Sequence, residues 1–139
     1  MKRLVILGAS GHGRVAADIA GKNGYDSIAF LDDTKKTCGR YPVMGESARF
    51  SEYDCDFFVA IGNPQVRRRM QEMLLTAGKQ VTTLIHPSAV IGEDVTLGTG
   101  TLVAAGTVSI GAGTWIGAGA TVSNNLQICG GCMIGAGAV

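Results

Sequence analysis

Charged residues are scarce in this sequence, and no long hydrophobic run interrupts it. Asp, Glu, Lys and Arg make up 17% of the 139 residues, and the formal net charge is only +1. A chain so close to neutrality lacks the charge excess that binding to nucleic acid or to a membrane surface uses, so we expect neither partner. No stretch is long enough to span a bilayer, and the apolar run from Arg3 to Gly8 is too short for a signal peptide.

Aromatic residues and cysteines are also few. Phe, Trp and Tyr account for 6% of a chain that is 46% hydrophobic, so we expect a core of stacked aliphatic side chains. The four cysteines suggest a reducing cytoplasm. Cys129 and Cys132 have the C-x-x-C spacing of a metal pair or a redox dithiol, but no second pair accompanies them. Because Cys129 also occupies the small-residue position of a six-residue repeat, we interpret it as structural and predict no metal site.

Glycine, by contrast, is abundant, and most of the 21 glycines accompany a six-residue repeat that begins at Ile85. An aliphatic residue returns at Ile85, Ile91, Leu97 and Val103, and then at Ile110, Ile116, Val122, Ile128 and Ile134. A small residue follows at Gly92, Gly98, Ala104, Gly111, Gly117, Ser123, Cys129 and Gly135. This period predicts a parallel β-helix with three flat faces, in which each aliphatic points inward and stacks on the next coil about 4.8 Å away. The small residue allows the backbone to turn a corner, whereas a Gly/Ala-rich linker would not keep its aliphatics in phase.

The N-terminus begins with a strand, a glycine-rich turn and a helix. Arg3 to Leu7 is a short apolar strand, Gly8 to Gly13 follow as the turn, and apolar residues then recur at helical spacing. This arrangement places backbone N–H groups and a helix N-terminus against a phosphate, although a plain tight turn is the alternative. The spacing is G-x-x-G-x-G rather than the dinucleotide fingerprint G-x-G-x-x-G, which weakens an NAD assignment. Ser10 is predicted either to cap the helix or to donate to a phosphate oxygen.

A second strand, Ser27 to Leu31, ends in the acidic pair Asp32 and Asp33. Acidic residues at this point, roughly 20 residues after the glycines, commonly hold the ribose of a nucleotide. The alternative is a solvated turn before the lysines that follow. We therefore predict that the two aspartates belong to the same nucleotide pocket as the glycine-rich turn.

A third strand, Phe57 to Ile61, runs into Gly62-Asn63-Pro64 and a helix over residues 65–77. Pro64 suits the first turn of that helix. We assign none of the three consecutive arginines near its start to a ligand. Val81 to Ile85 is predicted as the last strand before the solenoid, so residues 1–84 form a Rossmann-like β-α-β-α-β unit with its pocket at the carboxyl ends of the strands.

Four motifs in this order resemble the sugar acyltransferase family. They are Gly8-Ala9-Ser10-Gly11-His12-Gly13, Phe30-Leu31-Asp32-Asp33, Val59-Ala60-Ile61-Gly62-Asn63 and Leu84-Ile85-His86-Pro87. The family includes sialic acid O-acetyltransferases and, more similar to this chain, N-acetyltransferases of UDP-linked 4-amino-4,6-dideoxy sugars. The resemblance implies an α/β nucleotide-binding domain over residues 1–84, followed by a left-handed parallel β-helix acyltransferase domain over residues 85–139.

The resemblance also implies a site and its ligands. Ser10, Gly11 and His12 would meet a UDP-linked amino sugar, Asp32 and Asp33 would hold the uridine, and Gly62 with Gln65 would line the same pocket. Ala118 and Ala136 match positions whose backbone contacts acetyl-CoA, which serves as the co-substrate. The resemblance further implies a cytoplasmic homotrimer that binds acetyl-CoA between neighbouring subunits, and a reaction that needs no metal.

One departure from the family concerns catalysis. The family's base is a histidine followed by an acidic residue in the middle of the solenoid, whereas the only histidines here are His12 and His86. The repeat slips by one residue between Val103 and Ile110, and we interpret residues 106–109 as a seam from which about two coils are missing. The repeat is still in progress at Val139, although terminal repeats normally need a cap. We expect either that residues are omitted from the sequence or that the solenoid is a shortened form, and the catalytic residue stays unknown.

Three functions remain open on these grounds. The first is acetyl transfer from acetyl-CoA to the amino group of a UDP-linked sugar of the 4-amino-4,6-dideoxy-GlcNAc type. The second is O-acetylation of a sialic-acid-type sugar, and the third is a non-catalytic nucleotide-sugar-binding scaffold. His86 is a further candidate for a substitute base; its alternative role is to bridge the two domains.

Overall fold

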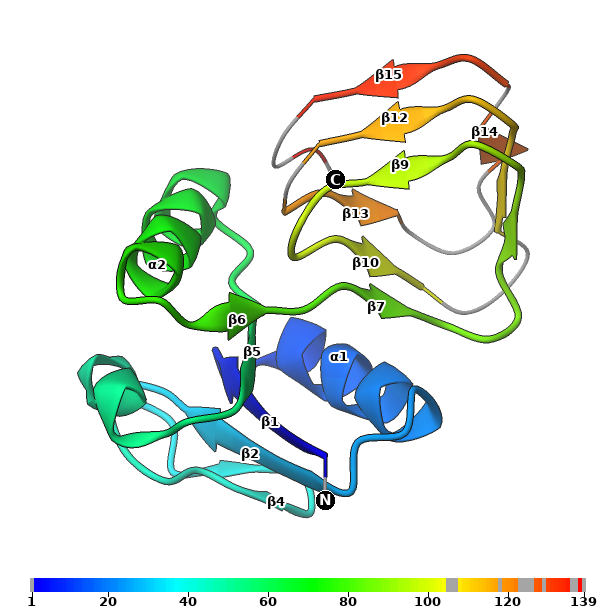
Figure 1. Ribbon diagram of the computed structural model, residues 1–139. Helices are drawn as coiled ribbons and strands as arrows, with labels where there is room; N and C mark the ends of the chain where they lie inside the picture. Colours follow the sequence, from blue (N-terminus) through cyan, green and yellow to red (C-terminus); the bar gives the residue numbers. More distant parts are fainter. Residues whose placement is uncertain are drawn as a thin grey trace. The chain divides into compact units, whose positions relative to one another are not determined.

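The computed structural model describes residues 2–104, 108–117, 119–122, 127–128, 130–135 and 138. The chain divides into two compact units, Met1–Thr82 and Thr83–Val139 (Figure 1). The boundary therefore falls two residues before the predicted one. Among the described residues, no helix combines the length and the hydrophobicity needed to cross a bilayer.

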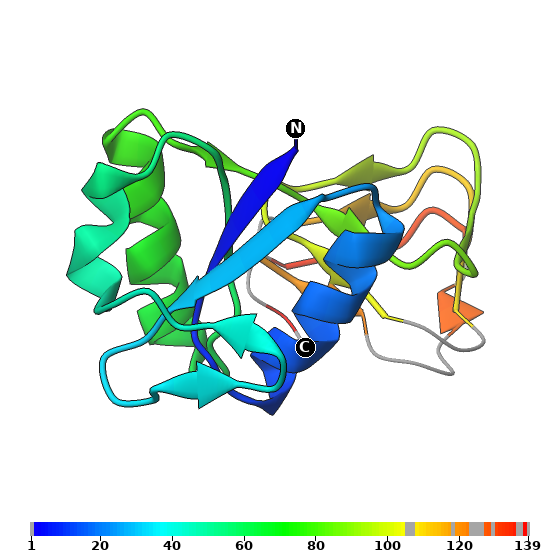
Figure 2. The same cartoon turned by 90° about the horizontal axis from the view of Figure 1, so that it is seen from below.

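A four-stranded parallel sheet forms the centre of the N-terminal unit. Its order is β2-β1-β5-β6, with β1 at Arg3–Leu7, β2 at Ser27–Leu31, β5 at Asp56–Val59 and β6 at Gln80–Val81. Four of the five residues of β1 are buried in succession, as expected of a parallel strand covered on both faces. Figure 2 shows the two covering layers, with α1 (Gly11–Lys22) on one side of the sheet and α2 (Pro64–Thr76) on the other.

Two smaller elements lie between β2 and β5. The strands β3 (Thr37–Cys38) and β4 (Tyr41–Pro42) form an antiparallel hairpin, and η1 (Ser47–Glu52) is a 3₁₀ helix. Phe50 of η1 packs against the core formed by β1, β2, β5 and α2. These elements surround the carboxyl end of β2, where the acidic pair was predicted.

In the described part of the C-terminal unit, nine two-residue strands form three parallel sheets. The strands are β7 (Leu84–Ile85), β8 (Val90–Ile91), β9 (Thr96–Leu97), β10 (Leu102–Val103), β11 (Ser109–Ile110), β12 (Trp115–Ile116), β13 (Thr121–Val122), β14 (Gln127–Ile128) and β15 (Met133–Ile134). The sheets are β7-β10-β13, β8-β11-β14 and β9-β12-β15, so every third strand pairs with the strand one coil away. Stacked parallel strands of this kind are those of a β-helix with three coils.

The predicted aliphatics form the solenoid core. Val103, Ile110 and Ile116 of the middle coil are all buried, whereas in the outer coils Val122 is buried and the other repeat aliphatics are only partly buried. The difference arises because a middle coil has neighbours on both sides and an outer coil has one. The register continues across the one-residue slip, since Val103 pairs with Ile85 and Ile110 pairs with Ile91. The slip, predicted as a seam over residues 106–109, falls between β10 and β11, where residues 105–107 lie outside the described residues.

The corners differ from the prediction in one respect. The left-handed backbone conformation occurs two residues after the small residue, at Asp94, Gly100, Gly113, Gly119 and Gly131. At Gly92 the small residue is needed for another reason, since an added Cβ would lie 2.6 Å from the backbone nitrogen of Ala112 in the next coil. The small residue at Gly92 thus permits close approach between coils, and the left-handed turn is made by the residue two positions after the small one.

The predicted strand from Val81 to Ile85 is wrong. It is divided between β6, whose Val81 pairs with Phe57, and β7, whose Leu84 pairs with Leu102. The division falls at the boundary between the units, because the N–H of Thr82 still donates to the carbonyl of Phe57 at 2.9 Å. A continuous apolar run therefore belongs to two different sheets.

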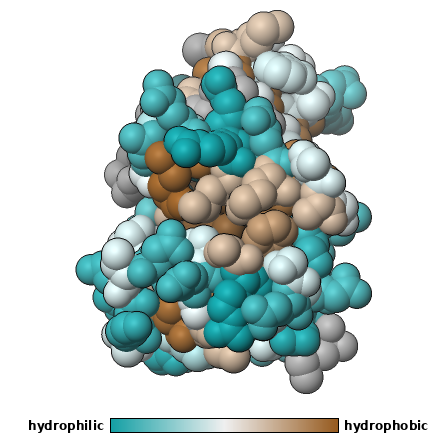
Figure 3. All heavy atoms as spheres, turned by 90° about the vertical axis from the view of Figure 1, so that its left-hand side faces the viewer, coloured by the Kyte–Doolittle hydropathy of each residue, from teal (hydrophilic) through white to brown (hydrophobic). Residues whose placement is uncertain are grey.

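Hydrophobic side chains also reach the surface. Figure 3 shows one face on which hydrophilic residues predominate and hydrophobic ones gather in patches between them. The exposed large hydrophobics include Met73 and Leu75 of α2, and Trp115 and Met133 of the solenoid. The last two are cross-strand neighbours on β12 and β15.

Candidate functional site

The candidate site lies at the carboxyl ends of β1 and β5. These strands are neighbours, with Leu7 opposite Val59, but the chain leaves them in opposite directions. From β1 it passes through α1 to β2 on one side, and from β5 it passes through α2 to β6 on the other. In open parallel sheets such a divergence leaves a crevice in which ligands bind.

Three glycines shape the turn after β1, each in a different way. Gly8 has φ of +109°, and an added Cβ there would collide with the carbonyl oxygen of Ala60. Gly13 lies against the carbonyl of Gly8, and its Cβ would be 2.9 Å from a ring carbon of Phe30. At Gly11, in contrast, a Cβ would meet nothing within 4 Å. Tight turn, close helix packing and open backbone are the three requirements of a pyrophosphate-binding turn, here met at a different spacing.

The first turn of α1 is open to an anion. Ser10 is the N-cap residue of α1. It is exposed, and its side chain makes no capping hydrogen bond. No acidic residue occupies the first turn. Both the hydroxyl of Ser10 and the free N–H groups that begin a helix are thus available, and the helix dipole favours a negative ligand there.

The turn after β5 presents a second helix start. Asn63 caps α2, because its Oδ1 accepts hydrogen bonds from the N–H groups of Gln65 at 2.9 Å and Val66 at 3.1 Å. Pro64 occupies the first position of the helix, as predicted. Gly62 and Gln65 are exposed, and a Cβ at Gly62 would meet nothing within 4 Å. The predicted residues of this loop therefore face open space.

His12 follows the turn after β1, in α1, and Arg67 follows the turn after β5, in α2. Burial, reinforced by the positive charge of Arg67, lowers the pKa of His12 below its usual value. The Nε2 atom of His12 is buried and has no hydrogen-bond partner in the described part of the chain. Arg67 is only 3% exposed and donates from Nη1 to the carbonyl of Ile61 at 2.8 Å.

Sequence reasoning assigned Arg67 no role, yet the spacing contained a signal. Arg67, Gln71 and Leu74 follow one another at intervals of four and three residues, which places them on one face of a helix. That face is the buried one.

Asp32 connects the acidic pair to the glycine-rich turn. Its Oδ2 accepts from the N–H of Ala9 at 2.8 Å, and its Oδ1 accepts from the N–H groups of Thr34 at 2.9 Å and Lys35 at 2.8 Å. Burial alone would raise the pKa of Asp32, but these hydrogen bonds outweigh it and hold the pKa below its usual value. The carboxylate thus fixes both loops.

Asp33 is arranged differently. It is exposed, and one of its oxygens accepts from the N–H of Ser47 at the start of η1, at 2.9 Å. Both aspartates line a cavity of about 320 Å³, together with Lys35, Met44 and Arg49. The last three residues were not predicted, because the cavity joins segments whose proximity depends on the fold.

The structure thus places the predicted residues in two groups. Ser10, Gly11, His12, Gly62 and Gln65 surround the ends of β1 and β5, whereas Asp32 and Asp33 line the cavity beyond β2. The hydrogen bond from Ala9 to Asp32 joins the two groups.

The solenoid supplies less of the predicted site. Ala118 and Ala136, the two predicted acetyl-CoA positions, lie outside the described residues. Among the described residues there is no cluster of three side chains that could hold a metal ion.

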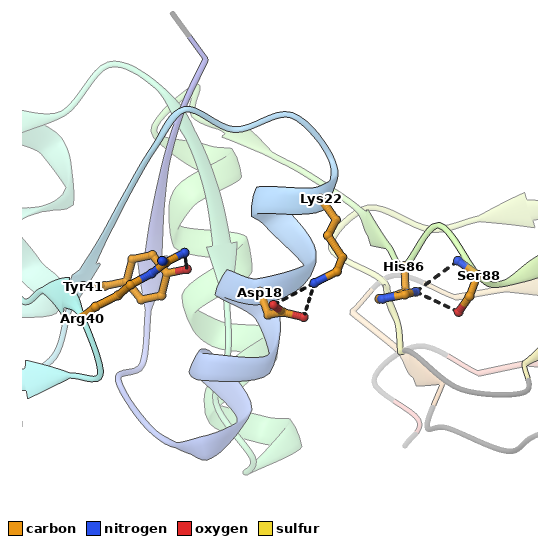
Figure 4. A network of polar contacts seen from close by, with 6 residues as sticks. All are labelled: Asp18, Lys22, Arg40, Tyr41, His86 and Ser88. Atoms are coloured by element: carbon orange, nitrogen blue, oxygen red, sulfur yellow. Dashed lines mark hydrogen bonds and ion pairs between the residues drawn. The ribbon is translucent and has the colours of Figure 1, made fainter.

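His86 has a defined environment (Figure 4). Its Nδ1 accepts from the N–H of Ser88 at 3.1 Å and lies 2.8 Å from the hydroxyl of the same residue. Because Nδ1 accepts a backbone N–H, the neutral ring carries its proton on Nε2.

The described elements are thus an α/β unit with an open glycine-rich turn, followed by a stack of short parallel strands. The chain belongs to the family described as the PglD N-terminal domain, whose model matches residues 3–74, more than half of the sequence. The resemblance to sugar acyltransferases is therefore confirmed at the level of the family.

Curated and solved relatives agree with this placement. UDP-N-acetylbacillosamine N-acetyltransferase of Bacillus subtilis (strain 168) is 33% identical over 113 residues, which cover 76% of this chain and 52% of that protein. The chain spans about half the length of the curated relatives it matches.

Two solved structures resemble the chain over nearly its whole length. The acetyltransferase domain of PglB from Neisseria gonorrhoeae FA1090, in complex with acetyl coenzyme A, has a TM-score of 0.92 at 30% identity and covers 98% of this chain and 68% of its own. PerB from Caulobacter crescentus, in complex with CoA and GDP-perosamine, has a TM-score of 0.88 at 30% identity. The match covers 99% of this chain and 67% of the PerB chain.

Proposed function

We propose that the chain acts in acetyl transfer from acetyl-CoA to the amino group of a UDP-linked amino sugar, of the 4-amino-4,6-dideoxy-GlcNAc type, in glycan biosynthesis. The observation that carries the proposal is the division of roles among Gly8, Gly11 and Gly13, which leaves an open backbone beside a helix N-terminus. The names of the relatives support an amine as the acceptor, rather than the hydroxyl of a sialic-acid-type sugar.

In this proposal the N-terminal unit is Rossmann-like and holds the nucleotide sugar. The N–H groups of the first turn of α1 and the hydroxyl of Ser10 bind the diphosphate, and Gly11 and Gly62 allow it close to the backbone. His12 and Gln65 contact the sugar end. Asp33 offers its unused oxygen to the uridine, while Asp32 holds the two loops in register and accepts a ribose hydroxyl.

The proposed reaction joins the amine nitrogen to the thioester carbonyl carbon. The carbon–sulfur bond then breaks, CoA leaves as its thiol, and the amine loses one proton. An amine must be neutral to attack the carbonyl. A general base whose pKa lies near the operating pH removes the proton and increases the rate roughly 10²–10⁴-fold. Positioning of donor and acceptor supplies a further part of the rate.

His86 does not fit the role of that base. Its Nδ1 is engaged by the N–H of Ser88, and its Nε2 carries the proton of the neutral ring. Neither nitrogen can therefore accept a proton without breaking this arrangement. This observation favours a second candidate function, a nucleotide-sugar-binding module without transfer of its own.

One experiment separates the two functions. The chain is incubated with acetyl-CoA and a panel of UDP-linked and GDP-linked 4-amino sugars, and thiol release and product mass are followed. Release of thiol together with acetylated amine supports transfer, and His86→Asn should then leave the rate unchanged. Nucleotide-sugar binding with no thiol release supports the binding module. If no member of the panel binds and none causes thiol release, both functions are refuted.

The homotrimer with acetyl-CoA at Ala118 and Ala136 is part of the same proposal. The outward pair Trp115 and Met133, 43% and 78% exposed, gives the solenoid apolar surface suited to association. Light scattering tests the assembly: a mass of three chains supports it, and a monomer at micromolar concentration contradicts it.

A further inference from the structure

Arg67 differs from the two arginines that follow it. It is 3% exposed, whereas Arg68 and Arg69 are exposed. A guanidinium in the first turn of a helix faces the positive end of the dipole, and its burial carries a desolvation penalty. Burial accordingly lowers the pKa of Arg67. A side chain held against both effects requires compensating contacts.

Those contacts lie at the loop between β5 and α2. Nη1 of Arg67 donates to the carbonyl of Ile61 at 2.8 Å and lies 3.5 Å from the carbonyl of Gly62. The backbone N–H of Arg67 donates to the carbonyl of Asn63 at 2.9 Å, and Asn63 caps the helix. One residue therefore fixes three successive peptide units of the loop.

The ligand side of this loop is the part that stays open. Gly62 has no neighbour within 4 Å of a Cβ position, and the buried Nε2 of His12 has no partner in the described part of the chain. The guanidinium of Arg67 contacts the loop after β5, and its positive charge contributes to the lowered pKa of His12.

We propose that Arg67 is a positioning residue of the nucleotide-sugar site, which holds the Ile61 and Gly62 carbonyls so that the open backbone of Gly62 faces the diphosphate bound at the first turn of α1. The inference rests on the proposed function, because it presupposes an anionic ligand at the ends of β1 and β5. The buried positive charge of Arg67 also attracts that anion, because salt screens a buried charge little.

Three variants test the proposal. Arg67→Met keeps an apolar stem and removes charge and donors, Arg67→Lys keeps the charge, and Arg68→Met is the matched control from the exposed face. UDP binding is measured by calorimetry on the full chain. Loss of a charge-assisted hydrogen bond predicts about tenfold weaker binding or more for Arg67→Met, a smaller loss for Arg67→Lys, and a change within about twofold for Arg68→Met.

A second readout separates positioning from a merely structural role. The charge of Arg67 is the one that acts on His12, so Arg67→Met should raise the pKa of His12 in an NMR titration, and Arg68→Met should not. Melting curves establish that each variant is folded. If Arg67→Met does not fold, Arg67→Lys decides: weakened binding at an unchanged melting temperature supports the proposal, and wild-type binding overturns it.

The outcomes also distinguish this inference from the proposed function. If the wild-type chain binds neither UDP nor a UDP-linked amino sugar, the proposed function fails and the inference fails with it. If the wild-type chain binds UDP and a folded Arg67→Met variant binds it equally well, the inference alone is overturned.

Discussion

Gly11, Gly13 and Gly21 of α1 provide the most discriminating test of how the nucleotide turn is built, with Gly21 as a control outside the turn. Each is replaced by alanine, so the chemical change is the same methyl group. At Gly13 the methyl would collide with the carbonyl of Gly8 and approach Phe30, and both obstacles are held in the fold. At Gly11 and at Gly21 it would meet nothing within 4 Å.

The expected effects follow from these surroundings. Overpacking against backbone places Gly13→Ala near the upper end of about 1–3 kcal/mol of lost stability, which lowers the melting temperature of a small domain by roughly 10–20 °C. Gly21→Ala should stabilise the helix by about 0.5–1 kcal/mol and leave UDP binding unchanged. Gly11→Ala should fold normally but bind UDP about tenfold more weakly, since its methyl occupies the space through which a phosphate approaches.

Thermal unfolding and calorimetric titration with UDP are run on all three variants and the wild type. The reasoning is refuted if Gly13→Ala is as stable as the wild type, because the close packing would then be unnecessary. It is equally refuted if Gly11→Ala binds UDP as tightly as Gly21→Ala does.

Three further predictions concern the acidic pair and the solenoid. Asp32 has a lowered pKa, so its ionised form stabilises the fold above its ordinary value of 3.8, and this contribution is lost as the pH falls through the lower folded-state value. Asp32→Asn should therefore lower the free energy of unfolding by about 1–3 kcal/mol at pH 7, as measured by urea unfolding. The difference in stability between the variant and the wild type should narrow as the pH falls. A difference that stayed constant down to about pH 2 would contradict the prediction. Ile116→Ala, in the middle coil, should cost about 2–5 kcal/mol and Ile134→Ala clearly less, and equal urea midpoints would be evidence against three stacked coils. Gly92→Ala should destabilise by about 1–3 kcal/mol because of Ala112, whereas Gly135→Ala has free space and should melt within a degree or two of wild type.

The solenoid was predictable from the sequence because its pattern is local and repeated. Each inward aliphatic stands six residues from the next, and the same residues pair across coils in the structure, as Ile116 does with Leu97 and Ile134. The sequence could not show which residue makes the turn. The residues in the left-handed conformation include both glycine, as at Gly100, and aspartate, at Asp94, so no single residue type marks the turn.

The candidate site was predictable only where a chemical motif occupies consecutive residues. The turn from Gly8 to Gly13 and the pair Asp32–Asp33 carry such motifs. The cavity containing Lys35 and Arg49 does not, because it is closed by segments that the hairpin β3–β4 brings together. The hydrogen bond from the N–H of Ala9 to Asp32 likewise depends on three-dimensional proximity, because the two residues are 23 positions apart in the sequence.

The boundary between the units shows a further limit. Leu84 and Val81 are equally plausible strand residues, and the apolar run from Val81 to Ile85 gives no sign that its two ends pair with different sheets. Only the partners, Phe57 for Val81 and Leu102 for Leu84, distinguish them. Strand assignment from composition cannot detect such a change of partner.

The claim on which the account depends is that a nucleotide diphosphate binds at the divergence of β1 and β5. Titration of the isotopically labelled chain with UDP, followed through its backbone amide NMR signals, tests this directly. The account predicts that the largest shifts occur at Ser10, Gly11, His12, Gly62 and Gln65, with smaller ones at Asp33. Shifts concentrated instead around Tyr25 and Arg40, which line a separate cavity of about 440 Å³, or no shifts at millimolar UDP, would contradict it.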